Sequence, residues 1–241
     1  MNRVADGGFV TVSRVRSALL AGVLAGVLAV AGMASATAAG LIVEVRAHGQ
    51  PVAGAVVSLH SASARADVRP VAARMDQRGS QFDPRVLVVQ AGSAVAFPNS
   101  DNIRHHVYSF SAAKRFELPL YSGQPARPVV FDTPGVVTLG CNIHDWMVGH
   151  ILVLDTPYTG RTDASGRVEL AAPAGAYSLQ VWHPHQRPNT PPPRQAVVLG
   201  SATAAVDVDL DLQAPAATPR APADPKLRAL QEKLRSLKRD P

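Results

Sequence analysis

Short alternating runs of apolar residues, separated by turns, fill the middle of this 241-residue chain. In the first run Leu41, Val43 and Val45 share one face of an extended segment, because successive side chains of a strand point to opposite faces. Gly49-Gln50-Pro51 then provides a turn, and a second apolar run follows at residues 55–59. This pattern predicts two short strands at the start of the folded part.

Similar runs recur along the chain, with turn residues about every 8 to 12 positions and no convincing helical period. The segments 61–78 and 111–128 interrupt them and are expected to be irregular. Many short strands at this spacing are typical of a sandwich or barrel, so we predict an all-β protein. The further strands are expected at 86–89, 93–97, 105–110, 129–131, 136–139, 148–154, 168–170, 177–182, 196–199 and 206–212.

The N-terminal segment, residues 1–38, has the pattern of a secretory signal peptide. Arg14 and Arg16 precede an uncharged stretch over residues 17–43, and Ala36-Thr37-Ala38 offers a cleavage site. We therefore expect a periplasmic protein. The alternative is an uncleaved segment that anchors the chain in the membrane, since the uncharged stretch is long enough to span a bilayer.

The C-terminal segment, residues 213–241, begins with a Pro/Ala-rich linker and ends in a basic tail. Its leucines at 227, 230, 234 and 237 predict a short helix and, through that helix, a weak oligomer. The formal net charge of +6 belongs to the two ends, because residues 1–38 contribute +2 and residues 220–241 contribute +4. Residues 39–219 balance 14 basic against 14 acidic side chains, so the body lacks the charge pattern of a nucleic-acid-binding protein.

One short motif carries most of the chemistry. The only cysteine opens the sequence Cys141-x-x-His144-x-x-Met147, and a histidine pair, His105 and His106, lies about 35 residues upstream. Exported proteins usually pair their cysteines, so a single one indicates a reactive or ligated thiol; a buried inert thiol is the alternative. One thiolate, two imidazoles and a thioether form the ligand set of a mononuclear blue copper site. Two adjacent histidines on a strand point to opposite faces, so only one can join that site.

Residues 80–154 resemble a cupredoxin, the family of plastocyanin and amicyanin. The opening is similar to plastocyanin-like domains in the pattern Phe82-x-Pro84, Val88, Gly92-x-x-Val95-x-Phe97-x-Asn99. The loop from Cys141 to Met147 is similar to the short ligand loop of amicyanin. The segments 97–105, 107–110 and 141–147 also resemble bacterial proteins labelled methylamine-utilization proteins.

The resemblance implies a Greek-key β-sandwich with one type 1 copper ion. Its implied ligands are His105, Cys141, His144 and Met147. Counting residues from Asn99 in the plastocyanin pattern places the upstream histidine ligand at His105, and His106 is the rival upstream ligand. His106 also replaces an asparagine that braces the ligand loop in the family, which leaves the bracing of this loop open.

The resemblance further implies that electrons pass to and from redox protein partners at the exposed edge of His144. Trp146 is then either part of a docking patch or a side chain packed on the sandwich.

The flanking segments, residues 40–66 and 155–212, resemble a carboxypeptidase-regulatory or transthyretin-like module. The resemblance rests on residues 49–59, on Thr162-Asp163-x-x-Gly166-Arg167 and on Pro173-Ala174-Gly175-x-Tyr177. It implies a second, smaller β-sandwich that is split by the inserted cupredoxin domain.

The sequence therefore predicts a copper protein that carries single electrons, and the resemblance suggests methylamine utilization as its context. We expect no enzyme activity, because four protein ligands leave the metal no open position. Three alternatives remain: a copper carrier or sensor without a redox partner, an enzyme in which Met147 does not bind the metal, and a structural β-sandwich that mediates interactions.

Overall fold

The computed structural model describes residues 38–125, 127–187 and 190–213. The predicted signal segment up to residue 37 and the predicted tail from residue 214 lie outside these residues. Over the described ranges the chain forms strands β1 to β18 and the five-residue helix α1, Ala62–Ala66, which confirms the prediction of an all-β protein. No helix within these ranges has the length and apolar character needed to cross a membrane.

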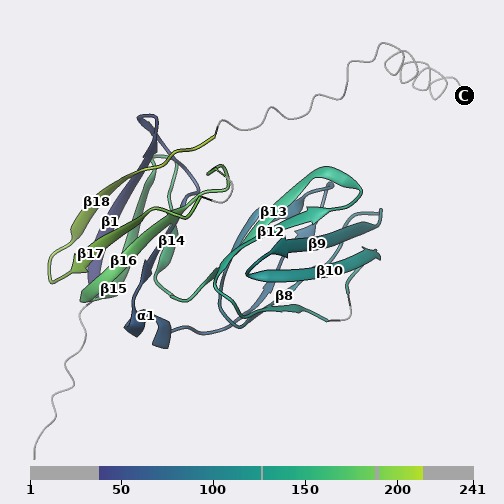
Figure 1. Cartoon of the computed structure of the whole chain (residues 1–241), viewed down its shortest axis with the longest axis horizontal. Helices are drawn as coiled ribbons and strands as arrows, with labels where there is room; N and C mark the ends of the chain where they lie inside the picture. Colours follow the sequence, from purple (N-terminus) through teal and green to yellow (C-terminus); the bar gives the residue numbers. More distant parts are fainter. Residues whose placement is uncertain (1–37, 126, 188–189, 214–241) are drawn as a thin grey trace, which may run out of the picture. The chain divides into compact units, whose positions relative to one another are not determined.

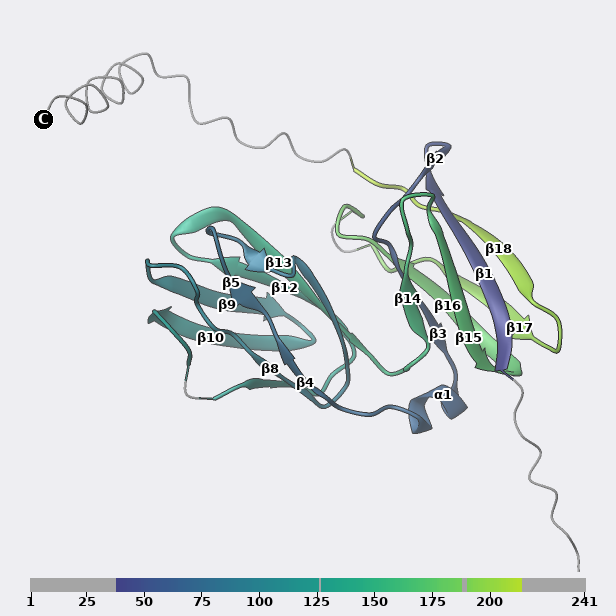
Figure 2. The same cartoon turned by 180° about the vertical axis from the view of Figure 1, so that it is seen from behind.

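Two sheets made from the first and last described segments form what we call the split sandwich (Figure 1, Figure 2). In one sheet the strand order is β15-β1-β18, with β2 paired to the end of β1. In the other the order is β14-β3-β16-β17. The strands are β1 Ala38–Ala47, β2 Gln50–Pro51, β3 Val56–His60, β14 Thr159–Arg161, β15 Arg167–Pro173, β16 Gly175–Trp182, β17 Arg194–Leu199 and β18 Ala204–Asp209.

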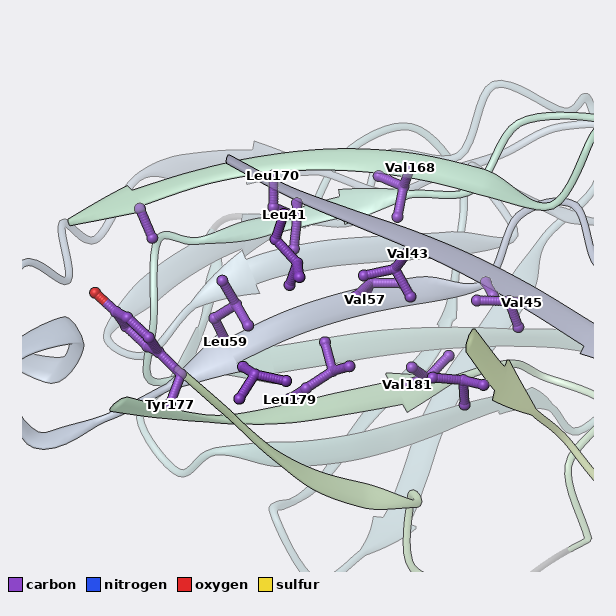
Figure 3. Close-up of a cluster of buried hydrophobic side chains, with 14 of the residues drawn as sticks. Leu41, Val43, Val45, Val57, Leu59, Val168, Leu170, Tyr177, Leu179 and Val181 are labelled. Carbon is purple, nitrogen blue, oxygen red and sulfur yellow. The ribbon is translucent and has the colours of Figure 1, made fainter. Parts of the chain in front are cut away.

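The core of the split sandwich follows from strand alternation. Leu41, Val43 and Val45 on β1 are fully buried, whereas the residues between them are only partly covered. They face Val57 and Leu59 of the other sheet, and Figure 3 shows these side chains pointing into one cluster. Each fully buried aliphatic side chain stabilises the fold by roughly 1.5–3 kcal/mol relative to an exposed one.

The strands between these segments form what we call the continuous sandwich. Its larger sheet has the order β10-β9-β12-β13-β7, a smaller one has the order β11-β8-β4, and β5 pairs with β6. Buried side chains from residues 75–153 form its own core, separate from that of the split sandwich. The strands are β4 Ala72–Arg74, β5 Asp76–Gln77, β6 Phe82–Asp83, β7 Val86–Gln90, β8 Ser93–Ala96, β9 His105–Ser111, β10 Lys114–Tyr121, β11 Val129–Phe131, β12 Gly135–Cys141 and β13 His144–Leu154.

Two segments that we expected to be irregular contain regular structure. Within 61–78, Ser61 caps α1 by accepting a hydrogen bond from the backbone N–H of Ala64, and β4 pairs in parallel with β8. Within 111–128, β10 forms an edge strand paired with β9. Both predictions were wrong. β10 contains no fully buried residue, but its partly covered side chains Phe116 and Leu118 pack against the core of the continuous sandwich.

Candidate metal centre

Three predicted ligands meet at one end of the larger sheet of the continuous sandwich. One ligand atom each from His105, Cys141 and His144 lies within 4.8 Å of the other two. The sulfur of Cys141 is 3.8 Å from Nδ1 of His105 and 3.7 Å from Nδ1 of His144. Sheet pairing explains the meeting, since β9, which begins at His105, lies next to β12, which ends at Cys141.

The β12–β13 hairpin places the other two ligands. Cys141 pairs directly with His144 across the hairpin, and directly opposed residues of an antiparallel pair present their side chains on the same face. The register then shifts, because Gly140 pairs with Val148. The residues between His144 and Val148 therefore form a bulge, an irregularity that commonly re-aims side chains beside functional sites.

The donor separations fit a small metal ion. Bonds of about 2.3 Å to a thiolate sulfur and 2.0–2.1 Å to an imidazole nitrogen, set about 120° apart, place the two donors about 3.8 Å from each other. The separations of 3.7 and 3.8 Å from Cys141 agree with that value. A soft thiolate combined with two imidazoles in a trigonal plane is the equatorial set that copper occupies in blue-copper sites.

The centre is largely shielded from water. His105 is fully buried and Cys141 is 4% exposed, whereas the ring of His144 is half-buried. Met147 is also buried, in the same apolar cluster as Cys141, with Val107 and Leu139. Its role as a weak axial ligand stays a prediction.

The structure brings His105, not His106, to the other donors. Nε2 of His106 lies 2.8 Å from Oε1 of Glu117 on β10, and its ring packs 5.6 Å from that of Tyr108. The two histidines thus point to opposite faces of β9, as alternation along a strand requires.

Side chains in the 98–104 loop hold that loop together and contact the predicted ligand His105, a role that the sequence reasoning missed. The amide Nδ2 of Asn99 donates hydrogen bonds of 2.8 Å to the carbonyl of Ile103 and 2.9 Å to that of Tyr121. Asp101 lies 2.8 Å from Nε2 of His105 through its Oδ2. The only signal for this second contact was an acidic residue in a predicted loop, four positions before a candidate ligand.

Asp101 is an ionised acceptor of several hydrogen bonds. Its carboxylate also accepts from the backbone N–H groups of Gly79, at 2.6 Å, and Ser80, at 2.9 Å. Burial alone would raise the pKa of Asp101, but the hydrogen bonds from Ser80, His105 and Gly79 outweigh it and hold that pKa below its usual value.

Two exposed apolar side chains lie beside the half-buried His144. Trp146 is 59% exposed, and its ring centroid is 5.1 Å from that of His144. Ile143, the neighbouring loop residue, is 49% exposed. The alternative in which Trp146 packs against the sandwich is therefore wrong, and the loop presents an apolar surface beside a ligand.

No model of a known protein family matches this chain, and no curated protein matches it. Solved structures share local likenesses with it. A purple cupredoxin from Nitrosopumilus maritimus is 24% identical, with a TM-score of 0.31 over 34% of this chain and 99% of that one. A copper-containing nitrite reductase from Thermus scotoductus is 27% identical, with a TM-score of 0.32 over 36% of this chain and 22% of that one. A reduced variant of amicyanin is 23% identical, with a TM-score of 0.32 over 41% of this chain and 98% of that one.

Proposed function

We propose that this chain is a periplasmic type 1 copper protein that carries single electrons between redox proteins. The observation that supports the proposal best is the cluster of one cysteine sulfur and two imidazole nitrogens, in which the sulfur lies 3.8 Å from His105 and 3.7 Å from His144. A bound copper ion would supply the one-electron step. The soft, mixed donor set suits both of its charge states, so little has to move when an electron is exchanged.

The protein's own residues divide the remaining tasks. His105 and Cys141 hold the metal from the buried side, within a packed core that resists rearrangement. His144 faces outward, next to Trp146 and Ile143, so a partner that covers this apolar surface would come close to a ligand. Apolar and aromatic contacts of this kind suit a docking site.

Copper loading and visible spectroscopy test the metal assignment. The purified mature protein should bind one copper per chain and show an intense thiolate-to-copper charge-transfer band. Cys141→Ala and His105→Ala should abolish the band, whereas the matched control His106→Ala should keep it. A band that persists in Cys141→Ala would show that the donor set is wrongly assigned.

Met147 needs its own substitution. Met147→Leu nearly preserves side-chain volume and removes the thioether, so packing changes little. If Met147 is the axial ligand, the band should stay and the reduction potential should change, because the axial ligand tunes the potential of such a site. An unchanged potential would mean that Met147 is only a core residue.

Voltammetry separates an electron carrier from a copper carrier or sensor. A reversible one-electron wave from the loaded protein supports electron transfer, while a protein that only transports copper should release the metal on oxidation or reduction. We infer that the chain is not an enzyme, because four protein donors leave no position for a substrate. The resemblance to methylamine-utilization proteins makes an amine-oxidising enzyme the first redox partner to test.

A further inference from the structure

The contact between Asp101 and His105 joins a carboxylate to the buried imidazole of the metal centre. His105 is fully buried, and its Nε2 lies 2.8 Å from Oδ2 of Asp101. Because the carboxylate can only accept, the proton of the neutral imidazole belongs on Nε2. The lone pair is then on Nδ1, the atom that lies 3.8 Å from the sulfur of Cys141.

A separate element of the sandwich holds the carboxylate. The turn between β5 and β6 has two central residues with positive φ, Gly79 at 60° and Ser80 at 55°. A positive φ is uncommon for a serine, and such conformations persist where several surrounding contacts hold the backbone in place. Here the turn directs two consecutive N–H groups at Asp101. The carboxylate is thereby fixed by a hairpin that carries no predicted ligand.

Resting on the function proposed above, we propose that Asp101 is a positioning residue for the metal centre: it fixes the tautomer and direction of His105 and lowers the reduction potential. A carboxylate hydrogen-bonded to a metal-binding imidazole makes that imidazole a stronger donor. Its negative charge also stabilises the more highly charged oxidised ion, and this effect is strong because the centre is buried.

The substitution Asp101→Asn tests the proposal, with Asp145→Asn as its matched control. Asparagine keeps the shape but removes the negative charge and part of the capacity to accept hydrogen bonds. Asp145 is exposed and follows His144 directly, so its substitution removes the same charge near the centre. Voltammetry of the copper-loaded full chain should show that Asp101→Asn favours the reduced state about tenfold, a rise of about 59 mV for one electron. Asp145→Asn should move the potential much less.

A purely structural role for Asp101 predicts a different result. If the carboxylate only held the 79–80 turn, Asp101→Asn would lower the unfolding temperature and leave the potential at that of the control. That outcome would overturn the proposal.

The imidazole tautomer gives a readout that needs no copper. Nitrogen-15 NMR of the metal-free full chain should show His105 protonated on Nε2, and this preference should weaken in Asp101→Asn. An Nδ1-protonated or unchanged tautomer would overturn the proposal even if the variant bound no copper. The function proposed above fails separately, if the unmodified chain forms no charge-transfer band.

Discussion

The close packing of Tyr108 on Gly140 predicts that a single added methyl group destabilises the continuous sandwich. Gly140 directly precedes Cys141 and pairs with Tyr108 across β12 and β9. A Cβ atom at residue 140 would lie 2.7 Å from Cζ and 2.8 Å from the hydroxyl oxygen of Tyr108. The ring cannot move freely along the strand, since His106 and Phe110 flank it at centroid distances of 5.6 and 5.1 Å.

Two opposing effects decide the magnitude. Gly140 does not have a positive φ, so alanine fits its backbone. Alanine should stabilise the protein by about 0.4–1 kcal/mol, because it lowers the conformational entropy of the unfolded chain. Overpacking against a ring that lies between two neighbouring rings costs about 1–3 kcal/mol. Gly140→Ala should therefore destabilise the protein by about 1–2 kcal/mol. In a Tyr108→Ala background the clash is gone, and the same substitution should become stabilising by about 0.4–1 kcal/mol.

Urea unfolding of the metal-free chain measures this change of sign. The protein has two tryptophans, so a Trp182→Phe background leaves Trp146 as the fluorescent reporter on the continuous sandwich. The midpoint should fall in Gly140→Ala and rise when Tyr108→Ala is already present, with an unchanged slope. If Gly140→Ala has the same effect in both backgrounds, the two residues are not in contact as described.

Three further outcomes follow from other contacts. Burial alone would raise the pKa of Asp155, but hydrogen bonds from His60 and Arg65 lower it below its ordinary value of 3.8. The ionised Asp155 therefore stabilises the fold above that pH, and this contribution is lost as the pH falls through the lower pKa of the folded state. In pH-dependent unfolding experiments, Asp155→Asn should reduce the loss of stability at acidic pH. Trp146→Ala should keep the charge-transfer band and the potential but slow electron exchange with a partner protein in stopped-flow measurements; an unchanged rate would remove the exposed tryptophan from the docking surface. Copper at about 100 times its dissociation constant should stabilise the chain by about 2.7 kcal/mol in thermal unfolding, and Cys141→Ala should show no such gain.

The strands were predictable wherever one face is buried. Leu41, Val43 and Val45 alternate with polar or partly covered residues, and such a period of two has few other interpretations. The edge strand β10 gives a weaker signal, because its inward-facing side chains Phe116 and Leu118 are only partly buried where they pack against the core. β13 is also longer than the expected strand at 148–154, because a bulge allows it to begin at His144.

The candidate site was predictable to the extent that its chemistry is local in sequence. Cys141 and His144 lie three residues apart, and their side chains are ones that copper prefers. In the sequence, only the count from Asn99 favoured His105 over His106, whereas the structure shows directly that His105 lies with the other donors and His106 lies beside Glu117. The contact of Asp101 depends on where a loop and a distant turn meet, and no periodicity in the sequence encodes such a meeting.

The topology of the split sandwich determines when its strands can pair during synthesis. β1 lies between β15 and β18, so the strands that flank it along its length emerge from the ribosome only after about 120 further residues; the two-residue β2 pairs only with its end. At about 5–20 residues per second, an apolar strand stays without them for several seconds or more. The strands of the continuous sandwich, by contrast, are complete by Leu154. All strands of the continuous sandwich are therefore available to pair before β15 and β18 are made, and the split sandwich is the last part of the described chain whose strands can assemble.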